Sequence, residues 1–285
     1  MGAQSISVAG AMERSEAWRV TRAQLYGALF AVGFANGIAE RALSAIGESG
    51  LIGAFFNTFG VSALIWVAAG GVFWLLRQAG HERARPMDFW LASIACIGFI
   101  FPMSAASWLG LAILAAYLVW TSTSGDPMRR AGVLMFGMTI PMLWARLLFA
   151  SMSNTILSID AKMVGMVVGT GSSGNTIPFW DGTGVLFLEP ACSSLTNVSL
   201  ALLCGVFFMS IFNRSWSLNV LKAVVAACVA TVAINVTRMS AIAFFPTYYD
   251  LIHGAVGASA AEWLSIIAVL SIYFRWITPD VAHRA

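Results

Sequence analysis

Residues 223–245 read AVVAACVATVAINVTRMSAIAFF, an almost unbroken apolar run whose one charged side chain is Arg238. The hydrocarbon core of a bilayer is about 30 Å thick, so a helix needs roughly 20 apolar residues to cross it. The composition of the whole chain agrees with such a helix. Of the 285 residues, 59% are hydrophobic and 10% are charged, whereas soluble domains are charged at roughly a quarter of their positions. The sequence therefore predicts an integral membrane protein.

Further apolar stretches predict an all-α polytopic membrane protein with about eight transmembrane helices in a single domain, residues 1–285. The third and fourth stretches are short and are separated only around Pro102. We interpret them as a helical hairpin, because one merged helix would exchange the sides of every later loop. The expected spans are residues 23–39, 52–76, 88–102, 105–121, 131–150, 193–212, 219–244 and 259–277.

The basic residues set the expected orientation. With the N-terminus inside, all of the 16 lysines and arginines except Arg41, Arg146, Lys162 and Arg238 fall in cytoplasmic parts. The positive-inside rule favours this arrangement. We therefore expect a plasma (inner) membrane protein with both termini, including residues 1–22, in the cytoplasm. The net charge of +3 is divided among short clusters between apolar runs, which is typical of membrane anchors and not of a nucleic-acid surface.

Residues 151–192 form the one informative loop, and they are expected on the outer, periplasmic side. Residues 151–168 have apolar side chains at helical spacing, which favours a helix near the membrane interface. After the break GTGSSGN at 169–175, residues 176–188 (TIPFWDGTGVLFL) predict a short hairpin that turns at Asp181-Gly182. The chain then returns to the membrane at Cys192.

Cys192 is the first candidate for chemistry. If Arg214 marks the cytoplasmic end of the next helix, about 33 Å of helix places Cys192 at the outer end. Pro190, Ser193 and Ser194 all suit the start of a helix. A thiol there would face free N–H groups and the positive end of the helix dipole, which predicts a lowered pKa. The alternative is that Cys192 is a small apolar side chain that only fills space in the packing. The location of Cys192 alone does not decide between this role and a reactive thiol.

Arg238 and His253 are the next candidates. Arg238 lies about 24 Å along its helix from Lys222, near the outer boundary. A charge at that depth usually faces the bundle interior or a water-filled site, although it can also extend to the outer headgroups. Asn235 lies three residues earlier, on the same face, where it could orient the guanidinium. A lone loop histidine is usually unremarkable, but thiol, guanidinium and imidazole on one side make a workable acyl-transfer set.

Two further charged residues are expected beside this set. Arg146 lies near the outer end of the fifth span, where it would help to bind substrate or pair with Glu189. Glu262 follows His253 by nine residues and could orient it. A purely structural role is the alternative for each. The chain has no CxxC pair, so neither a zinc site nor a disulfide framework is indicated, and no metal or organic cofactor is expected.

These residues resemble the signatures of the exosortase/archaeosortase family of membrane cysteine transpeptidases. The family has a cysteine that opens a late helix, an arginine in an NxxR motif, and a histidine or arginine further on. The matching segments here, in the same order and spacing, are EPACSSL at 189–195, NVTR at 235–238 and HGAVG at 253–257. The resemblance covers roughly residues 88–277.

The resemblance implies substrates and a reaction. The substrates would be exported proteins with a C-terminal motif (Pro-Glu-Pro in the PEP-CTERM group), a transmembrane helix and a basic tail. Cys192 would cleave this sorting signal through a thioacyl intermediate and transfer the protein to an acceptor. The family often has glycine where Ser194 stands and an arginine shortly after it, and this departure leaves the subtype and the sorting motif open.

Two rival functions remain at this stage. An anion or small-solute transporter would use the intramembrane residues Arg146 and Arg238 for binding, and it predicts that Cys192→Ala is nearly silent. Inverted repeats would favour it, and none is evident. A membrane assembly factor without chemistry would leave Arg238 with no role beyond packing.

Overall fold

The computed structural model describes residues 20–277, apart from the side chains of Ala191 and Ala255. The described chain is almost wholly helical and divides into two compact units, Met1–Phe136 and Gly137–Ala285. Within the described part, six helices are long and apolar enough to cross a membrane, and two shorter apolar helices accompany them. The predicted all-α polytopic fold is confirmed, whereas the number of eight spans and the single domain stay predictions. Residues 1–19 of the predicted cytoplasmic N-terminus lie outside the described residues.

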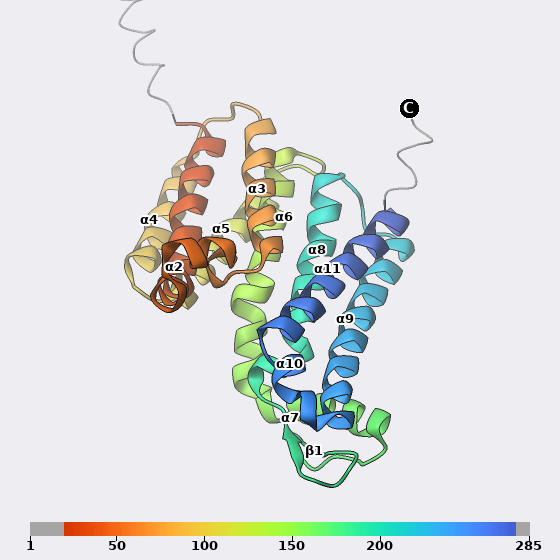
Figure 1. Cartoon of the computed structure of the whole chain (residues 1–285). Helices are drawn as coiled ribbons and strands as arrows, with labels where there is room; N and C mark the ends of the chain where they lie inside the picture. The colour runs from red at the N-terminus through yellow and green to blue at the C-terminus, as the bar shows by residue number, and fades with distance from the viewer. Residues whose placement is uncertain (1–19, 278–285) are drawn as a thin grey trace, which may run out of the picture. The chain divides into compact units, whose positions relative to one another are not determined.

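The first unit consists mainly of helices α2 to α5 (Figure 1). Thr21 and Gln24 start α2 with a capping box, which satisfies free N–H groups of its first turn. Helix α5 contacts both α2 and α4. The bounds are α2 Arg22–Phe56, η1 Thr58–Gly60, α3 Ala63–Gln78, α4 Pro86–Ile100 and α5 Ser104–Thr121, followed by the start of α6, Pro127–Thr139.

The boundary predicted between the first two spans is wrong. Helix α2 does not end at residue 39 but continues to Phe56 through a kink at Gly50, whose φ is 70°. The second span, predicted to begin at residue 52, begins at Ala63, after a turn in which Phe59 has a φ of 55°. Hydropathy misses this turn because apolar residues flank it on both sides. The separation of the third and fourth spans at Pro102 is confirmed, since α4 and α5 are distinct helices.

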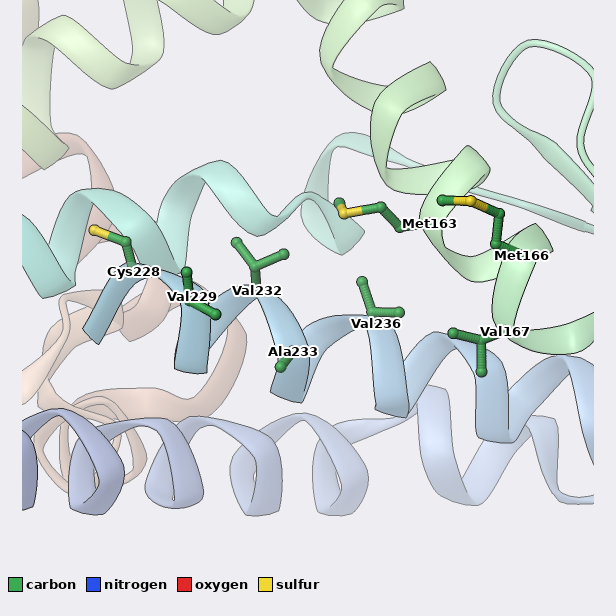
Figure 2. Close-up of a pocket in the computed structure, with 8 residues that line it drawn as sticks. All are labelled: Met163, Met166, Val167, Cys228, Val229, Val232, Ala233 and Val236. Carbon is green, nitrogen blue, oxygen red and sulfur yellow. The ribbon is translucent and has the colours of Figure 1, made fainter. Parts of the chain in front are cut away.

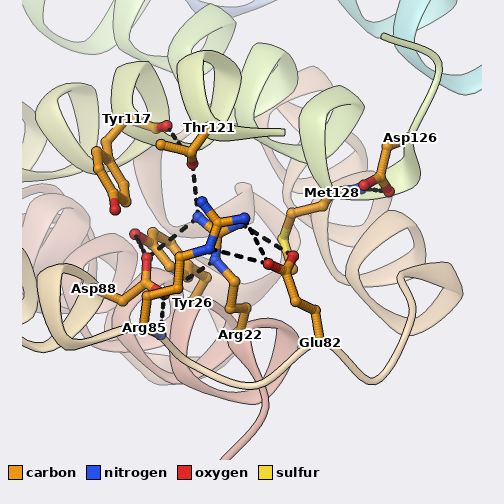
Figure 3. Close-up of polar contacts among 9 residues, drawn as sticks. All are labelled: Arg22, Tyr26, Glu82, Arg85, Asp88, Tyr117, Thr121, Asp126 and Met128. Atoms are coloured by element: carbon orange, nitrogen blue, oxygen red, sulfur yellow. Dashed lines mark hydrogen bonds and ion pairs between the residues drawn. The ribbon is translucent and has the colours of Figure 1, made fainter. Parts of the chain in front are cut away.

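A buried polar cluster joins the helices of this unit (Figure 3). The guanidinium of Arg22 donates from Nε to Asp88 Oδ2 at 3.0 Å and from Nη2 to Asp88 Oδ1 at 3.2 Å. Thr121 Oγ1 accepts from Nη2 at 2.7 Å, and Glu82 accepts from Nη1 at 3.3 Å. The hydroxyl of Tyr26 donates to Asp88 at 3.0 Å. The cluster therefore ties the start of α2 to α4 and to the end of α5.

The second unit contains the end of α6 and helices α7 to α11. Helices α8, α9 and α11 contact one another and run side by side (Figure 1). The hydroxyl of Tyr273 in α11 donates to the carbonyl of Ala201 in α8 at 2.9 Å. The bounds are η2 Ile140–Trp144, α7 Ala145–Val168, β1 Thr176–Pro178, β2 Val185–Phe187, η3 Pro190–Cys192, α8 Ser194–Ile211, α9 Leu218–Phe244, η4 Pro246–Tyr248, α10 Tyr249–His253 and α11 Ala255–Ile277.

Helix α6 continues into α7 through the π-helical turn η2. Pro141 in this turn has no N–H to donate, which interrupts the regular helical ladder. The expected boundary at residue 150 lies two residues before a kink at Met152, and the expected interfacial helix 151–168 forms the part of α7 that follows this kink. Its position at the membrane interface stays a prediction.

The predicted hairpin is confirmed. Strands β1 and β2 pair antiparallel, with Ile177 opposite Leu186, and Gly182 in the connecting turn has a φ of 69°. Ile177 and Leu186 are buried against apolar side chains of α7 and α9, whereas Phe187 is exposed. Trp180 N donates to the carbonyl of Ala243 at 3.1 Å. The hairpin is thus fastened to α9, and it leads the chain directly to Cys192.

Candidate active site

Cys192 ends the short 3₁₀ turn that connects the hairpin to α8. Ser193 follows as the N-cap of α8, and its side chain accepts from Leu195 N at 3.2 Å. The thiol is buried, with a residue exposure of 2%, against apolar side chains from α7, the hairpin and α9. The sequence expectation that Cys192 lies in the first turn of the helix needs a small correction, because the cysteine precedes the N-cap.

Two side chains from neighbouring helices hold this turn. Asn235 Nδ2 in α9 donates to the carbonyl of Cys192 at 2.8 Å and to Ser194 Oγ at 3.0 Å. Asp160 Oδ2 in α7 accepts from Ser194 N at 3.0 Å. The predicted role of Asn235 in orienting Arg238 is therefore wrong: its amide lies toward the cysteine turn, because that turn offers two buried acceptors.

His253 is the last residue of the short helix α10, and its ring lies beside the thiol. The Nε2 atom is 3.5 Å from Cys192 Sγ, a hydrogen-bonding distance for sulfur. Tyr249, one helical turn earlier, stacks on the imidazole with ring centroids 4.9 Å apart and planes 13° apart. The structure thus brings together the thiol and the imidazole that the sequence analysis placed on the same side, although 61 residues separate them.

Arg238 fixes the end of α10. Its Nε donates to the carbonyl of Ile252 at 3.1 Å, and its Nη2 donates to the carbonyl of His253 at 2.9 Å. The last carbonyls of a helix lack intrahelical donors and carry partial negative charge, so a guanidinium stabilises them. Arg238 therefore holds the backbone that carries the imidazole.

The electrostatics of the thiol differ from the prediction. Burial raises the pKa of Cys192 above its ordinary value. A backbone hydrogen bond from Glu189 and the charge of Arg238 lower this pKa, and the charges of Glu189 and Asp160 raise it. The predicted lowering is wrong in sign because the thiol is desolvated, and desolvation disfavours its charged form. The N–H groups of Cys192 and Ser193 are engaged elsewhere, since Cys192 N donates to Glu189 O at 2.9 Å and Ser193 N to Pro190 O at 3.2 Å.

The remaining predicted residues lie outside this constellation. Arg146, Glu189 and Glu262 are exposed, and none of the three has a side-chain hydrogen bond or ion pair within residues 20–277. The suggested Arg146–Glu189 pair and the suggested contact of Glu262 with His253 are therefore not formed. In the same described range, no three His, Cys, Asp or Glu side chains gather into a set that could hold a metal ion.

Asp160 and Tyr249 were missed by the sequence reasoning. Asp160 is the only acidic residue of α7, and a lone acid in an apolar helix is itself a signal of a specific partner. Tyr249 had no comparable signal, because its stacking on His253 depends on the geometry of a five-residue helix.

An apolar groove of about 630 Å³ runs between α7 and α9 (Figure 2). Its lining is free of charged side chains, and the thioether side chains of Met163 and Met166 face the valines of α9 across it. Val236, at one end, also packs in the apolar cluster that buries Cys192. The groove is therefore continuous with the surroundings of the candidate nucleophile. The other lining residues are Val167, Cys228, Val229, Val232 and Ala233.

A thiol beside an imidazole, in a polytopic helical membrane protein, gives the nucleophile and base that a membrane cysteine acyltransferase needs. The family model of transmembrane exosortases matches residues 55–275, well over half of the chain, and the chain belongs to this family. Family membership supports a membrane transpeptidase for sorting signals in general. Neither a curated protein nor a solved structure is significantly similar to the chain.

Proposed function

We propose that this protein cleaves the C-terminal, PEP-CTERM-like sorting signals from exported proteins. The remaining exported protein is then transferred to an acceptor through a thioacyl intermediate on Cys192. The observation that carries the proposal is the 3.5 Å distance between Cys192 Sγ and His253 Nε2. We further propose that both termini are cytoplasmic in the plasma membrane and that this site faces the periplasm, as the distribution of basic residues favours.

In the first step, Cys192 Sγ attacks the scissile carbonyl carbon, and His253 Nε2 takes the thiol proton. Because burial raises the pKa of this thiol, the neutral thiol is the resting form, and proton transfer to the imidazole accompanies the attack. The carbon–nitrogen bond then breaks, and His253 returns the proton to the leaving amine. An amine or hydroxyl of the acceptor, or water, attacks the thioester and transfers its own proton to His253. The carbon–sulfur bond then breaks, and His253 returns this proton to Cys192 Sγ.

Arg238 is the proposed donor for the oxyanion that forms during these attacks. The backbone N–H groups of residues 192–195 are all engaged, by Glu189 O, Pro190 O, Asp160 and Ser193 Oγ respectively. These four amides are therefore not available as donors, and we propose a side chain in their place. Arg238 uses Nε and Nη2 to hold α10, and its Nη1 makes no hydrogen bond within the described residues. One such preorganised donor is typically worth roughly 10²–10³ in turnover.

We propose that the groove between α7 and α9 receives the transmembrane helix of the substrate's tail. Its apolar, uncharged lining matches such a helix, and its continuity with the cluster around Cys192 would bring the motif near the thiol. Methionine side chains adapt to different apolar partners, which suits an enzyme that processes many tails.

The test is the length of a tailed substrate coexpressed with the wild-type protein or with Cys192→Ala. Removal of the tail only with the wild type supports the thiol as nucleophile. Removal with both forms excludes Cys192 from that role. An intact substrate with both forms, across a panel of motifs including Pro-Glu-Pro, contradicts the proposed substrate class.

A further inference from the structure

Asp160 is a buried carboxylate to which the reaction scheme gives no role. It is 4% exposed, and its Oδ2 accepts from the backbone N–H of Ser194 at 3.0 Å. Ser194 begins α8 and lies two residues after Cys192. A buried carboxylate is costly unless it is hydrogen-bonded, and a free N–H of a helix first turn is a suitable donor for it.

The turn that carries the thiol is held from two helices. Asp160 of α7 binds the N–H of Ser194, while Asn235 of α9 binds the carbonyl of Cys192 and the hydroxyl of Ser194. Without the bond to Asp160, Asn235 would be the remaining side chain from a neighbouring helix that binds the backbone of this segment, whereas His253 contacts only the thiol. The position of the thiol relative to His253 therefore depends on both helices.

The hydrogen bond between Asp160 and the Ser194 amide also affects which hydrogen-bond donors are available for an oxyanion near the thiol. Free N–H groups at a helix start bind anions readily. Asp160 occupies the N–H of Ser194, which removes this amide from the possible oxyanion donors.

We infer that Asp160 is a positioning residue, which holds the Cys192 turn in reach of His253 through its hydrogen bond to the Ser194 amide. The inference rests on the proposed function of Cys192 as the nucleophile. Asp160 touches neither the thiol nor the imidazole by any hydrogen bond, so its effect on the reaction is exerted through the backbone of the turn.

The charge and the hydrogen bond of Asp160 can be separated. The charged groups that influence the thiol come from each neighbouring segment: Arg238 of α9 lowers its pKa, whereas Glu189 and Asp160 raise it, and His253 of α10 lies beside it. An asparagine at 160 keeps an acceptor oxygen for Ser194 N and removes one negative charge. Asp160→Asn should therefore retain processing while it lowers the pKa of the thiol, which would show that the loss in Asp160→Ala comes from the hydrogen bond and not from the charge.

The experiment compares Asp160→Ala, Asp160→Asn, Ser194→Pro and the double variant Asp160→Ala/Ser194→Pro in the full-length protein. Proline is favoured at the first position of a helix and has no N–H. Ser194→Pro therefore removes the same hydrogen bond from the other side, together with the hydroxyl that accepts from Asn235. Processing of a tailed substrate is measured in membranes. The pH dependence of Cys192 alkylation by iodoacetamide is measured on purified protein by peptide mass spectrometry.

We expect Asp160→Ala to lower processing by roughly tenfold or more, because small displacements of catalytic groups are costly. Adding it to Ser194→Pro should cause no further loss, because the shared bond is already absent. Asp160→Asn should process within about threefold of the wild type, with its alkylation profile moved to lower pH. Asp181→Ala is the matched control, since Asp181 Oδ1 accepts from Thr183 N at 3.0 Å in the exposed hairpin, and it should process normally.

Near-normal processing by Asp160→Ala overturns the inference, as does a further large loss in the Ser194→Pro background. Equal loss in Asp160→Asn and Asp160→Ala overturns it as well, because the charge and not the hydrogen bond would then be essential. If Asp160→Ala fails to accumulate, Asp160→Asn decides: retained processing with the alkylation shift supports the inference, and lost processing overturns it. Activity of Cys192→Ala would instead refute the proposed function itself.

Discussion

Arg22 and Arg238 are both charged side chains of predominantly apolar helices, but their partners differ in kind. The side chain of Arg22 is fully buried and forms ion pairs with Asp88 and Glu82. Arg238 is partly exposed and binds the backbone carbonyls of Ile252 and His253. Within residues 20–277 no carboxylate forms an ion pair with Arg238.

The difference is between a charge that is neutralised and a charge that is not. Asp88 meets Arg22 in a two-point ion pair, and Thr121 and Glu82 take up further N–H groups of the guanidinium. The charge of Arg22 is neutralised by this pairing and is not available to bind a substrate. The carbonyls that hold Arg238 are neutral, so its charge remains to stabilise an anion that develops nearby. A guanidinium that is neutralised by carboxylates, as in Arg22, indicates a structural role. A guanidinium that keeps its charge, as in Arg238, indicates a role in the reaction.

The largest effect is expected from breaking the Arg22 cluster. Arg22→Leu leaves Asp88 buried without its counter-charge, which typically costs roughly 3–5 kcal/mol of the free energy of unfolding. The measurement is unfolding of the purified protein in mixed micelles by SDS titration. Arg77→Leu, which removes an exposed arginine at the end of α3, is the control and should be nearly neutral.

The double variant Arg22→Leu/Asp88→Leu sharpens this prediction. Removing both charges replaces an ion pair by apolar side chains, so it should recover much of the stability lost in Arg22→Leu. If the double variant is as unstable as the sum of the two single variants, the two charges do not act as a pair.

Arg238→Ala is expected to behave in the opposite way. It should lower the turnover of a tailed substrate by roughly 10²–10³, with the protein still present in the membrane. Arg238→Lys should lose less, because it keeps the charge but lacks the fork that donates to two carbonyls at once. Lys222→Ala, an exposed cation on the same helix, serves as the control. A loss of stability in Arg238→Ala as large as that of Arg22→Leu would remove the distinction between the two arginines.

The sequence could predict this contrast only in part. Apolar runs, basic residues and turn chemistry are local signals, so they predicted the helical class and the hairpin at 176–188. Topology then placed Cys192 and His253 on the same side, and the structure brings them within 3.5 Å. The pairing of Arg22 with Asp88 spans 66 positions, and no local pattern indicates which acid a given base will meet.

Burial explains most of the errors. Asn235 was expected to face Arg238 because the two residues share a helix face, but Asn235 is 5% exposed and binds the buried acceptors of the Cys192 turn. The pKa of Cys192 was expected to be lowered by the N–H groups and the dipole of the helix start, without the effect of the side chains that bury the thiol. Desolvation depends on the side chains that cover a group, and these come from three separate segments of the chain.

Alkylation of Cys192 gives a smaller, pH-dependent test of the same contrast. A free thiol has a pKa of about 8.5, and burial raises the pKa of Cys192. The thiolate therefore forms at higher pH, and the rate of alkylation should still increase above pH values where a free cysteine has reached its plateau. Because Arg238 lowers this pKa, Arg238→Ala should move the profile further toward high pH, whereas Arg22→Leu should leave it unchanged in protein that remains folded. A shift toward low pH in Arg238→Ala would contradict the assigned electrostatics.

The smallest expected effect concerns the ring that lies on the imidazole. Arg238 fixes the backbone of His253, but the orientation of the imidazole depends on Tyr249, whose ring stacks on it at a centroid distance of 4.9 Å. Such stacking contributes roughly 0.5–1.5 kcal/mol, so Tyr249→Leu should lower turnover by a few-fold, whereas Tyr249→Phe keeps the stacked ring and should lose less. Equal turnover in the two variants would mean that the backbone held by Arg238 is sufficient to orient His253. A difference between them would show that two supports, one on the backbone and one on the ring, direct Nε2 toward the thiol.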